Sequence, residues 1–148
     1  MRLFNKLKEM KMMLIDDDEW IRNSLSLFFE GEEIELRALE TAEEGLEELR
    51  KTPYDIIIVD YKLPGISGLE FLKRIHETHP HAIKILITAY KDKKLIAEAL
   101  NIGVQDFIEK PFTTSTIEQT LSWVINDRLL SQNHDLQRIK NKFNGGLK

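Results

Sequence analysis

Short runs of apolar residues alternate with longer amphipathic stretches along most of this chain. Four of the runs, rich in Ile, Leu and Val, cover residues 11–16, 55–60, 83–88 and 106–109. Continuous apolar runs of this length are typical of strands that are buried on both faces of a parallel sheet. A fifth segment, around residues 34–38, alternates apolar and charged residues, as a half-exposed strand does. The pattern therefore predicts five strands.

Helical periodicity fills the intervals between these strands. It predicts helices over about residues 18–30 and 93–102, a helix starting after Thr41, one carrying Leu69, Leu72 and Ile75, and a last one near residue 115. Thr41 with Glu44, and Ser115 with Glu118, match the capping-box pattern of a helix start. Five βα units with short connections predict helices on both faces of one parallel sheet. We expect a flavodoxin-like (βα)5 doubly wound fold of strand order 2-1-3-4-5, the order being adopted from known folds of this type.

Chemically active residues stand where four of the predicted strands end. Asp16 and Asp17 follow the first apolar run, Asp60 ends the third strand, Thr88 ends the fourth, and Lys110 follows the fifth. In a doubly wound sheet the carboxyl ends of the strands open into one crevice, where ligands bind. Three carboxylates, a hydroxyl and an ammonium are therefore expected to converge, which is typical of a metal-assisted phosphate site.

Hard divalent cations such as Mg²⁺ prefer a few carboxylate oxygens and retain several waters. We expect Asp17 and Asp60 to ligate Mg²⁺ directly, Asp16 to do so through water, and the main-chain carbonyl of Lys62 to complete the site. Carboxylates packed this closely repel one another, which favours metal binding.

Asp60 is our candidate nucleophile, because a carboxylate can accept a phosphoryl group covalently and the loop after its strand leaves it open to solvent. Lys110 and Thr88 would then contact phosphoryl oxygens, since this chemistry depends mainly on positioning and charge neutralisation.

Length and composition limit the number of domains and exclude several classes of protein. The 148 residues suit one domain, which we place at 11–130, with an N-terminal extension at 1–10 and a helical tail or linker at 131–148. Cysteine is absent, which excludes disulfides and thiol catalysis. No apolar run approaches the roughly 20 residues that span a bilayer, so we expect a cytoplasmic protein without a membrane partner. Residues 14–111 carry a net charge of −9, which favours a cation site and argues against nucleic-acid binding.

Four segments together resemble the receiver domain of two-component response regulators, over about residues 11–130: LIDDDEWIR (14–22), IIIVDYKLPGISGLEFL (56–72), ILITAY (85–90) and GVQDFIEKPF (103–112). The resemblance implies that a histidine kinase or phosphotransfer protein phosphorylates Asp60. It also implies an acidic pair (Asp16 and Asp17), a switch hydroxyl (Thr88), a rotating aromatic side chain (Phe107), a phosphate-pairing Lys110 and a cis Lys110–Pro111 bond.

In similar proteins, the positions of Lys62 and Tyr90 tune hydrolysis of the aspartyl phosphate. Neither side chain acts readily as a base, so we expect slow loss of the phosphoryl group and no multiple-turnover enzyme. Kinase choice is expected to depend on Trp20, Ile21 and Phe112. The alternative for Phe107 is that it is an ordinary core residue and not a switch residue.

Several functions remain open from the sequence. The chain is expected to be a stand-alone signalling switch that contacts a downstream protein. One output would be a homodimer, formed either through the helix at 93–102, the strand at 106–109 and the helix starting near residue 115, or through the tail. Alternatives are a relay intermediate and the receiver segment of a regulator with a DNA-binding or enzymatic output. A remote alternative is an aspartate-based phosphohydrolase, because Asp16 and Asp18 form an Asp-x-Asp pair after the first strand. The basic amphipathic N-terminus is either docked or disordered.

Overall fold

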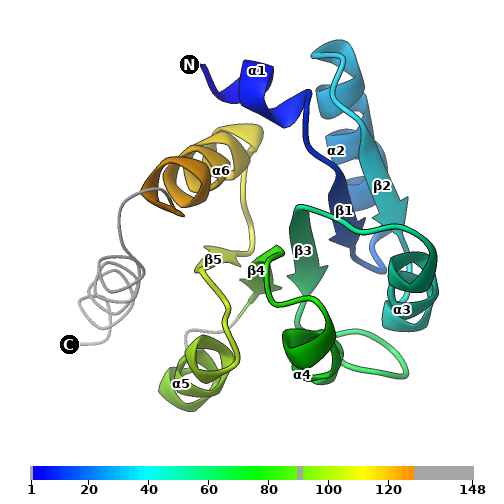
Figure 1. The fold of residues 1–148 in the computed structure, drawn as a ribbon, viewed down its shortest axis with the longest axis vertical. Helices are drawn as coiled ribbons and strands as arrows, with labels where there is room; N and C mark the ends of the chain where they lie inside the picture. Colours follow the sequence, from blue (N-terminus) through cyan, green and yellow to red (C-terminus); the bar gives the residue numbers. More distant parts are fainter. Residues whose placement is uncertain (1, 90–91, 129–148) are drawn as a thin grey trace.

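The computed structural model describes residues 2–89 and 92–128, and the fold is shown in Figure 1. Five strands and six helices are assigned in this part of the chain: α1 (Leu3–Leu7), β1 (Met12–Ile15), α2 (Glu19–Gly31), β2 (Leu36–Leu39), α3 (Ala42–Lys51), β3 (Ile56–Asp60), α4 (Gly68–Thr78), β4 (Ile83–Thr88), α5 (Lys93–Asn101), β5 (Asp106–Glu109) and α6 (Thr114–Arg128).

The strands form one parallel sheet of order β2-β1-β3-β4-β5, which confirms the predicted flavodoxin-like fold. β1, β3 and β4 are buried along their whole length, as continuous apolar runs predict. β2, at the sheet edge, is only partly buried. The predicted bounds of β4 and β5 agree with the structure, and the other strands differ by one or two residues.

Alternate side chains of each strand point into two separate cores. One core joins the strands to α3, α4 and α5 and includes Met13, Val59 and Phe107. The other joins them to α1, α2 and α6 and includes Leu14 and Ile58. The helices therefore cover both faces of the sheet, as Figure 1 shows, and the strand ends are left for the connecting loops. Among the described residues, no helix is both long and apolar enough to cross a membrane.

Helix α1 docks onto this second core. Leu7 is fully buried, and the Phe4 ring meets the Phe28 ring of α2 edge-on at 6.2 Å between centroids. Lys6 Nζ donates to Asn126 Oδ1 of α6 at 3.0 Å. Of the two alternatives for the N-terminus, the structure thus shows a docked helix.

Side-chain caps precede α2, α3, α4 and α5, and the cap of α6 departs from the prediction. The Thr41–Glu44 capping box is present at α3. The box predicted from Ser115 and Glu118 is wrong, because α6 begins earlier, at Thr114, and Thr113 Oγ1 accepts a hydrogen bond from Thr116 N at 3.3 Å. The helical tail or linker predicted at 131–148 lies outside the described residues.

Candidate functional site

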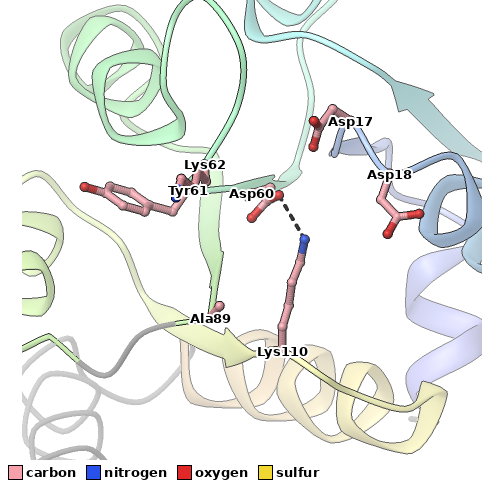
Figure 2. A pocket seen from close by; sticks show the side chains of 7 residues that line it. All are labelled: Asp17, Asp18, Asp60, Tyr61, Lys62, Ala89 and Lys110. Carbon is pink, nitrogen blue, oxygen red and sulfur yellow. Dashed lines mark hydrogen bonds and ion pairs between the residues drawn. The ribbon is translucent and has the colours of Figure 1, made fainter.

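Asp60 and Lys110 form the centre of the site. Asp60 is the last residue of β3 and only 4% of its surface is exposed. Lys110, directly after β5, reaches back across β4, and its Nζ lies 2.9 Å from Asp60 Oδ2 and 3.3 Å from Asp16 Oδ2. Figure 2 shows the Asp60–Lys110 contact between two of the side chains that line a pocket. One ammonium is therefore shared by carboxylates that extend from two neighbouring strands.

The acidic loop after β1 is held by its own hydrogen bonds. Asp16 is fully buried, and its Oδ1 accepts from Asp18 N at 2.9 Å. Asp18 in turn caps α2 by accepting from Trp20 N and Ile21 N. Asp18 Oδ1 thus acts as a helix cap, and the acidic cluster of the site consists of Asp16, Asp17 and Asp60 without Asp18.

Asp16, Asp17 and Asp60 each offer a carboxylate oxygen, and these oxygens lie within 4.8 Å of one another. Asp16 Oδ2 is buried and accepts no hydrogen bond within the described part of the chain, although Lys110 is near it. An all-oxygen donor set with an unsatisfied buried oxygen fits a hard cation such as Mg²⁺. The acidic cluster is thus one that could bind a metal.

Burial dominates the electrostatics of this cluster. It raises the pKa of Asp60 to about 6, and although the Lys110 hydrogen bond opposes the rise, the nearby Asp16 charge adds to it. Burial likewise raises the pKa of Asp16. Burial alone would lower the pKa of Lys110, but the hydrogen bond to Asp60 and the two negative charges outweigh it, so that the pKa is raised. Lys110 therefore stays an ammonium while both carboxylates are destabilised in their charged forms.

An open pocket of about 490 Å³ gives access to Asp60. Figure 2 shows its lining, which is formed by Asp17, Asp18, Asp60, Tyr61, Lys62, Ala89 and Lys110. Most of the predicted site residues therefore meet in one place. Asp60 itself was predicted to be open to solvent, and it is less exposed than that.

The two predicted switch residues lie behind this pocket. Thr88 is 1% exposed, and the residue of that strand end that lines the pocket is Ala89. The main-chain oxygen of Thr88 accepts a hydrogen bond from Lys110 N at 3.0 Å. Phe107 is fully buried in the core beneath α3, α4 and α5. The Lys110–Pro111 bond is cis, as the resemblance implied, while Tyr90 lies outside the described residues.

A second, apolar groove of about 560 Å³ adjoins the site between α2 and the loop after β5. It is lined in part by Trp20, Ile21 and Phe112, the three residues proposed for kinase choice. Trp20 is 74% exposed, so its large apolar ring is accessible at the surface beside this groove.

Sequence reasoning missed Arg22. Its Nη1 donates to the main-chain oxygen of Asp16 at 2.9 Å. No signal in the sequence marks this contact, because it depends on how α2 packs beside the end of β1.

This fold and site define a doubly wound α/β domain with an acidic cluster and a paired lysine at the carboxyl ends of its strands. Comparison with known proteins gives its family: a model of the response regulator receiver domain matches residues 12–122, and the chain belongs to that family. It is 35% identical to the transcriptional regulatory protein FixJ of Azorhizobium caulinodans over 104 residues, which are 70% of this chain and 49% of FixJ. It is 30% identical to the chemotaxis protein CheY-3 of Vibrio cholerae, over 77% of this chain and 90% of CheY-3.

Among solved structures, a receiver domain protein from Clostridium thermocellum superimposes with a TM-score of 0.72 at 26% identity, covering 82% of this chain and 98% of that one. The chain spans about half the length of FixJ and 34% of the longer regulator PilR.

Proposed function

We propose that this chain is a phosphorylation-dependent signalling switch that accepts a phosphoryl group on Asp60 from a histidine kinase or a phosphotransfer protein, with Mg²⁺. The observation that carries the proposal is the placement of Asp60 in the lining of an open pocket, with Lys110 Nζ at 2.9 Å and two further aspartates beside it. Membership of the receiver family supports the same reading.

The described residues have distinct roles in this proposal. Asp60 Oδ1 or Oδ2 would form the new P–O bond as the donor's P–N bond breaks, and the donor imidazole would leave as the neutral base after taking up a proton. Asp16, Asp17, Asp60 and the carbonyl of Lys62 would hold Mg²⁺, which supplies charge neutralisation when it is bound. Lys110 would then pair with the phosphoryl group that replaces the free charge on Asp60.

The signal would follow from the charge added at Asp60. Thr88 would turn toward a phosphoryl oxygen, and the space it leaves would let Phe107 reorient. Both residues belong to strands next to α5 and α6, so we propose that the surface of α5, β5 and α6 responds. Loss of the phosphoryl group is proposed to be slow hydrolysis only, without multiple turnover.

The phosphodonor is proposed to dock at the apolar groove of α2 and the loop after β5. This groove ends at Asp18 and Lys110, which also line the phosphate pocket. A helical partner seated against Trp20 could therefore present a phosphohistidine to Asp60.

Phosphorylation can be tested with a small-molecule donor. Acetyl phosphate with Mg²⁺ should add one phosphoryl group to the protein, seen by intact mass spectrometry. Asp60→Asn should abolish this addition, while Asp55→Asn, an exposed residue directly before the other end of β3, should leave it unchanged. Equal uptake by Asp60→Asn and the wild type would contradict the proposal.

We propose two ways in which this receiver could pass on its signal. Near-complete coverage of CheY-3 favours a stand-alone switch or relay, while half coverage of FixJ favours the receiver segment of a longer regulator. Light scattering with Mg²⁺ and beryllofluoride, a mimic of the aspartyl phosphate, separates the modes of output. A monomer that becomes a dimer, except in Asp60→Ala, would indicate a dimer switch, and an unchanged monomer would indicate relay or partner docking. A constant dimer would implicate the tail.

A further inference from the structure

Arg22, in the first turns of α2, is tied to the acidic loop rather than to solvent. Its side chain is 18% exposed, and Nη1 donates to the main-chain oxygen of Asp16 at 2.9 Å. Nη2 lies 3.8 Å from Glu40 Oε2, at the end of β2. The guanidinium thus bridges the ends of two neighbouring strands from a third element, the helix that follows the loop.

The carbonyl that Arg22 holds belongs to the peptide bond between Asp16 and Asp17. A peptide unit is planar, so fixing its oxygen also fixes the direction of its N–H and of the next Cα. The other side of Asp16 is already held, because Asp16 N donates to Leu39 O at 3.1 Å. Together with the bond from Asp18 N to Asp16 Oδ1, the Arg22 bond therefore restrains the main chain at Asp17.

Asp17 needs such support more than the other two carboxylates of the cluster. Lys110 contacts Asp16 and Asp60 directly. In the part of the chain that the structure describes, the exposed Asp17 carboxylate makes no hydrogen bond or ion pair, yet it lies with the other two in the acidic cluster. Its orientation then comes from the main chain.

We propose that Arg22 is a positioning residue that directs the Asp17 carboxylate into the metal site by fixing the Asp16–Asp17 peptide. This inference rests on the proposed function, because it assumes that the acidic cluster binds Mg²⁺. Arg22 does not touch the phosphoryl group in this proposal; it acts through Asp17. Arg suits this role because its planar fork can contact two acceptors while its charge strengthens the bond to a carbonyl.

The test is the Mg²⁺ dissociation constant, measured by isothermal titration calorimetry without any phosphodonor. Arg22→Met removes the donors while keeping an apolar stem, and it should raise the dissociation constant about tenfold, equivalent to about 1.4 kcal/mol. Arg37→Met is the matched control, because Arg37 is 57% exposed and pairs with Glu48 of α3 instead. It should leave the constant unchanged.

Two further measurements separate positioning from simple destabilisation. The rate of phosphoryl uptake by Arg22→Met should approach the wild-type rate at saturating Mg²⁺, so that the Mg²⁺ requirement rises and the limiting rate does not fall. Val124→Ala, a cavity variant in the α6 core, should lower stability but keep the wild-type Mg²⁺ affinity.

Arg22→Lys provides the same comparison if Arg22→Met does not fold, and its dissociation constant should lie above that of the wild type. Wild-type affinity in Arg22→Met, or in Arg22→Lys where that variant has to be used, would overturn the inference while the proposed function stands. A wild-type chain that binds no Mg²⁺ would instead overturn the proposed function, and this inference with it.

Discussion

Replacing Asp60 with asparagine should stabilise the metal-free protein at neutral pH. The side chain keeps its shape and an oxygen that can accept from Lys110, but it loses a charge that the structure places in an unfavourable environment. Asp60 is 4% exposed and shares one ammonium with Asp16. A site arranged for a cation is expected to be strained without it.

The magnitude follows from the pKa of Asp60, which burial raises from 3.8 to about 6. One pKa unit corresponds to about 1.4 kcal/mol. Ionised Asp60 therefore destabilises the folded state by about 3 kcal/mol at pH 7. Because asparagine makes a weaker bond to Lys110 than a carboxylate does, we expect Asp60→Asn to raise the free energy of unfolding by about 1–3 kcal/mol.

The pH dependence has a definite sign. The folded pKa lies above the unfolded pKa, so protonated Asp60 contributes stability in full below about pH 4, and this contribution is lost as the pH rises through about 6. The advantage of Asp60→Asn over the wild type should accordingly be small near pH 4 and complete at pH 7.

The assay is urea unfolding followed by circular dichroism, in the presence of a chelator. Asp92→Asn is the control, because Asp92 is an exposed N-cap of α5 and asparagine caps a helix about as well as aspartate does. Mg²⁺ at a hundred times its dissociation constant should then add about 2.7 kcal/mol to the wild type and less to Asp60→Asn. A variant that is no more stable than the wild type at pH 7, or equally advantaged at pH 4, would refute the electrostatic reasoning.

Three further predictions concern the neighbours of this site. Lys110→Met should lower the free energy of unfolding at pH 7 by about 3 kcal/mol, because it leaves buried carboxylates without their cation. Urea unfolding should show a smaller loss at pH 5, where Asp60 takes up a proton. An equal loss at both pH values would contradict this. Thr113→Ala should lower the free energy of unfolding by about 1 kcal/mol, because it removes the α6 cap, while Ser115→Ala should change it by less than about 0.5 kcal/mol. A larger loss in Ser115→Ala than in Thr113→Ala would support the cap predicted from the sequence instead. Thr88→Ala should still be phosphorylated but show no phosphorylation-dependent change in hydrogen exchange over α5, β5 and α6. A normal change in this variant would refute the coupling between Asp60 and this surface through Thr88.

The sequence predicted the sheet and the convergence of the acidic residues because both depend on local, periodic signals. Apolar runs of strand length ending in Asp, Thr and Lys are visible without a structure, and parallel strands bring their ends together by geometry. The error at α6 had a local cause: Thr113 and Ser115 are both good caps two residues apart, and only the path of the chain after Pro111 decides between them. Arg22 could not be found in this way, since its acceptor is a main-chain oxygen whose position depends on the packing of α2 beside β1.

Helix α1 has a practical consequence for anyone who moves this domain between proteins. The family match starts at residue 12, yet the five residues of α1 cover part of the core between α2 and α6. A chimera joined at the family boundary would leave apolar side chains such as Phe28 without their cover and would remove the Lys6–Asn126 bond. Chimeras and truncations should therefore keep residues 2–10, because the packing contacts of this receiver extend beyond the segment that the family comparison matches.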